Sequence, residues 1–203
     1  MPLPAPLELD ESDAEGGATS DPARVRDIVV AEHAFVWRSL VRLGVPRADA
    51  EDAAQQVFLV VARRIADIEP GSERAFLYGV ALRVASRARR TLARRREVAE
   101  EQAPVRVDPA EHADAALDRA RARAVLDEIL GSMPLDLRSV FSLFELEQLT
   151  MAQIAEMLSL PQGTVASRLR RAREAFSEHC RRLEAKHRTD GALVAFNAER
   201  GAS

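Results

Sequence analysis

Residues 150–176, TMAQIAEMLSLPQGTVASRLRRAREAF, constrain the fold more than any other stretch of the sequence. Thr150 with Gln153 three residues later predicts a capped helix over 151–158, because each side chain can bond the backbone N–H of the other residue. A proline then marks a tight turn, and a basic helix is expected over 162–185. Two helices joined by so short a turn have the spacing of a helix-turn-helix.

The second of these helices is amphipathic. At 100° per residue one apolar stripe contains Val165, Leu169, Ala172 and Phe176, and it is expected to be buried. Four polar side chains are expected together on a neighbouring face, namely Thr164, Ser167, Arg168 and Arg171. Arginine and hydroxyl groups near a helix N-terminus suit base edges and phosphates in a major groove. The alternative is an ordinary solvated basic face, and the capped helix before it favours DNA binding.

Helix-starting and helix-ending residues divide the rest of the chain. Asp21 and Pro22 give an N-cap and a first-position proline, Gly44 ends that helix, and Asp49 is expected to cap the next. The further helices are expected over 50–67, 72–96, 114–130 and 135–147. Strand-like alternation and internal repeats are not found in the sequence. We therefore predict an all-α fold of two small helical domains joined by a flexible linker, with the helix-turn-helix in the second.

Charge is sorted along the chain although the formal net charge is only -3. Residues 1–22 carry six acids and no base, whereas residues 83–96 carry seven arginines and no acid. Local basic stretches matter more for phosphate contact than the total charge. The expected boundaries are a disordered acidic arm at 1–21, a first domain at 22–97, a linker at 98–113, a second domain at 114–187 and a tail at 188–203.

The expected helix over 50–67 has a core face and an outer face. Ala54, Val57, Phe58, Val61 and Ile65 share the core face. The outer face gathers Asp52, Gln55, Gln56, Leu59 and Arg63. A leucine ringed by polar groups is a candidate protein-contact patch. Single exposed leucines are also common, so the pattern alone leaves that alternative open.

The expected helix over 72–96 carries a stripe of cations. Arg83, Arg87, Arg90 and Arg94 lie at helical spacing, and Phe76 precedes them on the same side. Arginines suit phosphates and a flat ring can stack on a base, as in proteins that bind single-stranded nucleic acid. A solvated arginine face is the bland alternative, and repulsion between so many like charges disfavours it.

The run from Met133 to Phe176 resembles region 4 of the extracytoplasmic-function (ECF) sigma factors of RNA polymerase, in MPLDLRSVFSLFELEQLTMAQIAEML and LPQGTVASRLRRARE. The resemblance implies that the last helix reads the upstream promoter element, the −35 box, through Thr164, Ser167, Arg168 and Arg171. Ser159 stands at a turn position where the family usually has glycine.

The first domain resembles region 2 of the same family. The matching pattern is Asp49, Ala50, Glu51, Asp52, Gln55, Val57 and Phe58. The resemblance implies that Asp52, Gln55, Gln56, Leu59 and Arg63 bind core RNA polymerase. It also implies that Phe76 and the arginine stripe engage the downstream element, the −10 box, although Arg83 and Arg87 replace the asparagine and aspartate usual there. An anti-sigma factor is an expected partner.

The sequence gives no reason to expect catalysis or a cofactor. It has no glycine-rich phosphate loop, no His-Glu-x-x-His and no paired cysteines, and His179 beside Cys180 lacks further metal ligands. A single cysteine and the absence of a long apolar run predict a cytoplasmic protein without membrane insertion. Two alternatives are a helix-turn-helix regulator that acts without polymerase, and a nuclease or recombinase. The first would need a dimerisation surface, and the second would need carboxylates among the bases.

Overall fold

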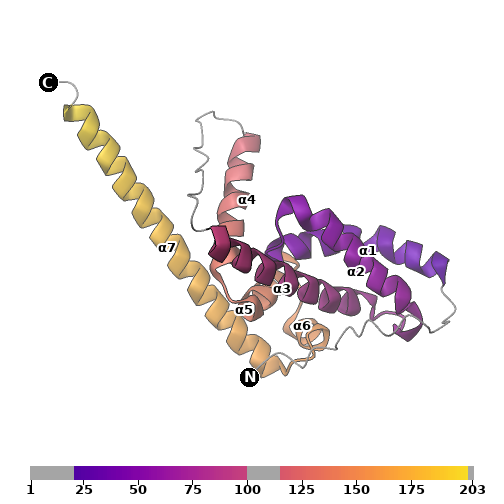
Figure 1. Cartoon of the computed structure of the whole chain (residues 1–203). Coiled ribbons are helices and arrows are strands. Elements are labelled where there is room, and N and C mark those ends of the chain that lie inside the picture. Colours follow the sequence, from indigo (N-terminus) through magenta and orange to yellow (C-terminus); the bar gives the residue numbers. More distant parts are fainter. Residues whose placement is uncertain (1–20, 100–114, 201–203) are drawn as a thin grey trace.

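The computed structural model describes residues 21–99 and 115–200, without the side chains of 93, 95–99, 115–121, 184 and 186–200. Within these ranges the regular structure is helical throughout and no strand occurs (Figure 1). The predicted all-α class is confirmed. We call α1–α3 the N-terminal part and α4–α7 the C-terminal part. The helices are α1 (Pro22–Leu43), α2 (Ala50–Arg63), α3 (Glu73–Ala99), α4 (Ala115–Ser132), α5 (Leu135–Phe141), α6 (Met151–Met157) and α7 (Gln162–Arg200).

Three predicted segments fall at the edges of the described ranges. The acidic arm lies outside them except for residue 21, and the linker lies outside them except for 98 and 99, which belong to α3. Most of the predicted tail is helical backbone at the end of α7. The boundaries of the two domains stay predictions.

The ends of α1 are those that the sequence predicts. The Asp21 carboxylate accepts hydrogen bonds from the backbone N–H groups of Ala23 and Arg24, at 3.1 and 3.0 Å, and Pro22 follows at the first helical position. Gly44 ends the helix in the left-handed conformation, with φ +103°. Such a conformation favours glycine, which has no Cβ to clash with the carbonyl.

The second helix is shorter than predicted. It ends at Arg63, and a 3₁₀ turn over Ile65–Asp67 follows. This turn brings Ile65 and Ile68 inward, where they are 2% and 4% exposed. Asp49 occupies the N-cap position, but its side chain makes no capping hydrogen bond because a 3₁₀ turn precedes the helix. The prediction that Asp49 caps α2 through its side chain is therefore wrong.

The predicted helix over 135–147 is two elements. α5 passes into a π-helical turn over Ser142–Leu146, in which the Glu147 N–H donates to the Ser142 carbonyl at 3.0 Å. The wider turn keeps Leu143 fully buried as the chain leaves the helix. π-Helical turns recur at functional sites, and Glu147 directly follows this one.

The helix-turn-helix has the predicted local structure. The capping box of Thr150 and Gln153 at the beginning of α6 is confirmed. Ser159, in the turn, has φ +51°, which is the conformation that the missing glycine would adopt without strain. α7 runs well beyond the predicted end at 185. Among the side chains that the structure describes, Leu183 is the last of α7 to pack against the second apolar cluster, and the helix backbone continues away from the body (Figure 1).

One apolar cluster crosses both parts of the molecule. It joins Leu40, Val57 and Leu77 of α1, α2 and α3 to buried side chains of the C-terminal part. Those side chains are Val140, Leu143, Ile154, Ala155, Val165 and Leu169. A second cluster lies within the C-terminal part, around Met133 and Phe141. The predicted flexible linker therefore joins two parts that pack directly on each other here.

Candidate polymerase and nucleic-acid interfaces

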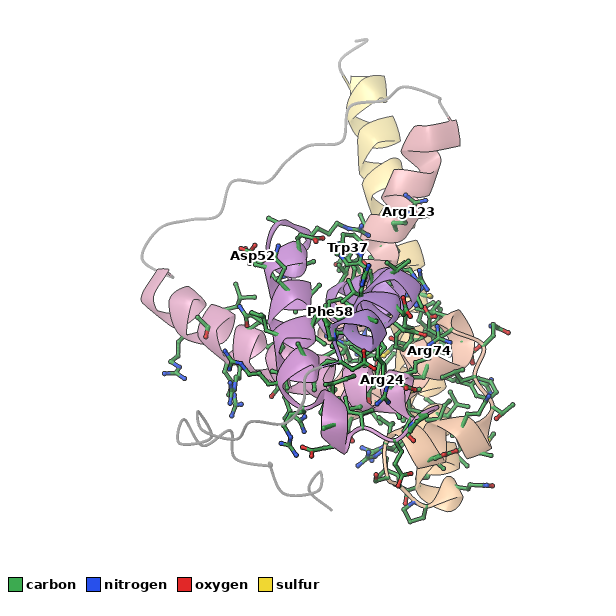
Figure 2. All side chains as sticks on the ribbon, turned by 90° about the vertical axis from the view of Figure 1, so that its right-hand side faces the viewer. Arg24, Trp37, Asp52, Phe58, Arg74 and Arg123 are labelled. Carbon is green, nitrogen blue, oxygen red and sulfur yellow. The ribbon has the colours of Figure 1, made fainter. Side chains whose placement is uncertain are left out.

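The outer face of α2 is uncovered. All five predicted contact residues are exposed, namely Asp52, Gln55, Gln56, Leu59 and Arg63, and Leu59 is 57% exposed. Their opposite face packs against α1 and α3. In Figure 2, Asp52 lies on the outward side of α2, and Phe58 lies toward α1, where its ring stacks on His33 at 6.0 Å. The helix thus presents a polar patch with an apolar centre on a rigid support, the composition typical of a protein-binding surface.

The cationic stripe on α3 is mostly exposed. Arg87, Arg90 and Arg94 are exposed, and Arg83 is half-buried. Burial lowers the pKa of Arg83, and the nearby charges of Arg87 and Arg64 lower it further. Such a site favours an anion, because a phosphate would relieve the repulsion between these guanidinium groups.

Phe76 is less available than the sequence suggests. The ring is half-buried and packs against the main apolar cluster. Because this packing holds the ring, stacking of its whole face on a base would require the ring to move. The structure therefore brings Phe76 and the arginines onto one helix but gives them different exposures.

Arg24 positions the beginning of α3, and the sequence reading missed it. Its guanidinium donates to the carbonyls of Ile65 and Ile68, at 3.2 and 2.6 Å, and pairs with Glu73 at 2.8 Å. The hydrogen bond from Arg24 lowers the pKa of the Glu73 carboxyl, against the opposing effect of desolvation. The sequence gives no specific signal for this role of Arg24, because arginine is abundant and these contacts span more than 40 residues in sequence. Figure 2 labels Arg24.

Three of the four side chains predicted for the recognition face lie away from the core at the beginning of α7. Ser167 and Arg171 are exposed and Thr164 is half-buried. The Ser167 hydroxyl donates to the Thr164 carbonyl at 2.9 Å. These three side chains lie on the outer side of the helix, opposite the buried Val165.

Arg168 does not share that exposed face, so its predicted exposure is wrong. It is 8% exposed, and its guanidinium lies 3.6 Å from the Asp136 carboxylate of α5. The helical period explains this position, because Arg168 follows Val165 by three residues and precedes Ala172 by four, and both are fully buried. In this conformation Arg168 ties α7 to α5.

Arg170 is a candidate that the sequence reading left out. It is exposed, pairs with Glu174 at 2.7 Å, and lies one turn after Ala166. It also lines a shallow groove of about 440 Å³ between α7 and the beginning of α6, together with Met151, Leu169 and Arg173. The helical period of α7 is enough to predict that Arg170, next to Arg171, is exposed.

The described residues contain no group of three or more side chains suited to hold a metal ion. His179 lies 3.3 Å from the Ser132 hydroxyl and 4.0 Å from the Glu128 carboxylate, which ties α7 to α4. Of the described helices, none is both long and apolar enough to span a membrane.

Two family models match the chain, one on each part. The model of Sigma-70 region 2 covers residues 28–95, and the model of Sigma-70 region 4 covers residues 123–176. The first contains α2 and most of the arginine stripe, and the second contains α5, α6 and the beginning of α7.

Curated relatives are similar over most of their length. The ECF RNA polymerase sigma factor SigE of Mycolicibacterium smegmatis is 31% identical over 186 residues, which is 88% of this chain and 69% of the relative. The RNA polymerase sigma-H factor of Pseudomonas aeruginosa is 29% identical, over 76% of this chain and 86% of the relative. The ECF RNA polymerase sigma-E factor of Escherichia coli K12 is 28% identical, over 73% and 83%.

Two solved structures share the fold. The sigma factor RpoE in complex with the anti-sigma factor NepR from Bartonella quintana aligns with a TM-score of 0.55 and 17% identity, over 78% of this chain and 97% of that one. CnrH in complex with the cytosolic domain of CnrY aligns with a TM-score of 0.57 and 20% identity, over 78% and 88%. With regions 2 and 4 matched in order and a relative 31% identical over most of both lengths, this chain belongs to the ECF sigma factors of RNA polymerase.

Proposed function

We propose that this sigma factor directs core RNA polymerase to promoters through three separate surfaces. The outer face of α2 binds the polymerase, the arginine stripe of α3 holds the opened downstream element, and the beginning of α7 enters the major groove at the upstream element. The single observation that carries the proposal is the exposed patch on α2 around Leu59, which the helices packed against α2 leave uncovered.

The residues proposed for the upstream element are revised by burial. Thr164, Ser167 and Arg171 remain, and Arg170 takes the place of Arg168, whose guanidinium faces Asp136. For the downstream element the proposed set is Arg83, Arg87, Arg90 and Arg94, with Phe76 at its edge. Two weak contacts joined on one chain raise the effective concentration of each at its site, which makes the pair selective.

The polymerase surface is tested by Leu59→Glu. A charge at the centre of a contact patch is expected to weaken binding of purified core polymerase by about tenfold or more. The matched control is Val30→Glu, because Val30 is the more exposed of the two, at 79%, and lies on α1 away from the patch. Equal binding by the two variants in a titration with labelled core enzyme would contradict the assignment of the polymerase interface to α2.

The upstream surface is tested by Arg171→Ala in the holoenzyme. If Arg171 makes a bidentate base contact, promoter binding is expected to weaken by about 1–3 kcal/mol. Arg181→Ala is the control, since Arg181 is exposed further along the same helix. Unchanged promoter affinity for Arg171→Ala contradicts the assignment. Tight promoter binding by the chain without polymerase would favour a regulator that acts alone.

We propose further that the chain is a non-catalytic cytoplasmic factor with an anti-sigma partner. The relatives are named as sigma factors of RNA polymerase. Both structural neighbours were solved as complexes, the RpoE structure with an anti-sigma factor and the CnrH structure with the cytosolic domain of CnrY. Co-purification of the tagged chain from its native host, followed by identification of the bound proteins, tests this partner and the core polymerase together.

A further inference from the structure

The arginine stripe of α3 has no carboxylate partner among the described residues. Other exposed arginines of the N-terminal part do have one, since Arg64 pairs with Asp67 at 2.6 Å and Arg74 pairs with Glu32 at 3.0 Å. Like charges one turn apart on a helix repel each other, so the stripe favours an anionic partner. Its four members are Arg83, Arg87, Arg90 and Arg94.

The chain itself carries an anionic segment that could serve, the acidic arm at 1–21, of which the structure describes only residue 21. The arm has six acids and no lysine or arginine. The linker at 98–113 is also acidic, but it includes Arg106. The arm is therefore the better electrostatic complement of the stripe. We call residues 8–15 the acidic segment, because they hold Glu8, Asp10, Glu11, Asp13 and Glu15.

The arm joins α1 beside the beginning of α3. Arg24, in the first turn of α1, donates to the Ile65 carbonyl at 3.2 Å and pairs with Glu73 at 2.8 Å. Because Glu73 is the first residue of α3, the two helices begin at the same end of the N-terminal part (Figure 1). The stripe is near this point as well, since the charge of Arg64, next to Ile65, lowers the pKa of Arg83.

The length of the arm fits the stripe. At 1.5 Å per residue, Arg83 lies about 15 Å along α3 from Glu73, and the stripe extends about 17 Å further to Arg94. An extended chain covers at most about 3.6 Å per residue, which gives about 22 Å from Asp21 to Glu15 and about 25 Å along the acidic segment. The acids can therefore reach the beginning of the stripe and cover all of it.

The arm must reverse its direction to follow α3, and its sequence permits this. α1 and α3 both run away from the end at which they begin (Figure 1), so a segment that covers the stripe has to turn before it enters α1. Gly16 and Gly17 lie between the acidic segment and α1. Glycine adopts turn conformations at little steric cost, which allows the reversal at the required place.

We propose that the acidic segment docks on the arginine stripe in the free chain and screens it from nucleic acid. A tethered segment has an effective concentration in the millimolar range, which offsets the weakness of each exposed ion pair. An unscreened stripe would bind any nucleic acid, because phosphate contacts carry no sequence information. In the holoenzyme further contacts favour promoter DNA over the arm. The screening rests on the proposed function of the stripe, whereas the docking does not.

Paramagnetic NMR on the full-length chain tests the docking. A nitroxide on Ser12→Cys, in a Cys180→Ser background, lies inside the acidic segment and broadens the amide signals of nearby residues. The signals of residues 83–94 are expected to broaden at low salt and to recover at about 1 M salt, where the Debye length is about 3 Å. Broadening centred on the basic face of α7, or no broadening of α3, overturns the docking.

A neutral arm and a neutral linker form a matched pair of variants with similar changes in net charge. The arm variant is expected to lose the broadening of α3, and the linker variant is expected to keep it. Equal broadening in the two variants contradicts a contact made by the charges of the arm. The arm variant carries Glu8→Gln, Asp10→Asn, Glu11→Gln, Asp13→Asn and Glu15→Gln. The linker variant carries Glu100→Gln, Glu101→Gln, Asp108→Asn and Glu111→Gln.

Binding of a labelled single-stranded oligonucleotide to the free full-length chain tests the screening. At low salt the arm variant is expected to bind about three- to tenfold more tightly than the linker variant, because it has lost a tethered competitor. Adding Arg87→Gln and Arg90→Gln to both variants is expected to remove this difference. Equal affinity before that addition overturns the screening. An arm that docks in a chain that binds no oligonucleotide would keep the docking and remove the proposed function of the stripe.

Discussion

The interior of the N-terminal part and its contact with the C-terminal part differ in the charged groups that they bury. Val57 and Leu77, like their neighbours inside the three-helix unit, are fully buried aliphatic side chains. The contact with the C-terminal part shares this apolar packing, through Val140 and Leu143, and adds the buried charges of Arg138 and Glu147, which are held by carbonyls and by arginines. Apolar packing keeps its strength when salt or pH changes, and ion pairs do not. The contact is therefore expected to respond to salt and pH more than the interior does.

The largest effect is expected from a change inside the N-terminal part. Val57→Ala removes two methyl groups from a site with 0% exposure and is expected to lower the free energy of unfolding by about 2 kcal/mol. Denaturant unfolding followed by circular dichroism measures it. Val30→Ala is the control, because Val30 is 79% exposed. A comparable loss of unfolding free energy in both variants would contradict the claim that buried aliphatic packing around Val57 stabilises the N-terminal part.

A smaller effect is expected from acid on the contact between the parts. Desolvation of the Glu147 carboxyl opposes ionisation, but the hydrogen bonds from Arg38 and Arg42 outweigh it, and the pKa lies below its ordinary value of 4.5. Tyr78 of α3 is a further titratable group near this carboxylate. A lowered pKa means that the stabilisation is complete above the ordinary value and is lost as the pH falls through the lowered one.

The contact between the parts is therefore expected to stay unchanged from about pH 7 to about pH 5 and to weaken as the pH falls below 4.5. Energy transfer between dyes on cysteines placed at Ala48 and Ala124, in a Cys180→Ser background, measures the distance between the two parts. Both positions are exposed. Glu147→Gln has no carboxylate to protonate at this site, so its response to acid is expected to be weaker. An identical acid response in both proteins would assign the opening to other groups.

The smallest effect is expected in the turn of the helix-turn-helix. Ser159 has φ +51°, a conformation that glycine adopts without strain. Ser159→Gly is expected to stabilise the chain by about 0.5–1 kcal/mol, after the greater freedom of glycine in the unfolded state is counted. Thermal unfolding measures the gain, and the transfer between the probes is expected to stay unchanged. A loss of stability would show that the serine side chain contributes more than the turn costs.

Local signals in the sequence predicted local structure well. Asp21, Gly44 and the capping box of Thr150 act over four residues or fewer, so their chemistry is visible without the fold. The helical spacing of the apolar residues in α2 likewise predicted that Leu59 is exposed, as it is in the structure. The resemblance to sigma factors then gave these faces a meaning that periodicity alone left open.

Long-range contacts are what the sequence could not supply. Arg168 was expected to be exposed because its partner, Asp136, belongs to another helix. Arg24 and Arg138 bond backbone carbonyls, which every residue offers, so no side-chain pattern marks their partners. In a chain with this many arginines, only the fold distinguishes those that bind DNA from those that hold the structure.

The central claim is that this chain directs core RNA polymerase to chosen promoters. In-vitro transcription with purified core polymerase on fragments of the host genome tests it most directly. The account predicts discrete transcripts that appear only when the chain is added and that decline with Leu59→Glu but not with Val30→Glu. A chain that neither associates with core polymerase nor yields any defined start site contradicts it.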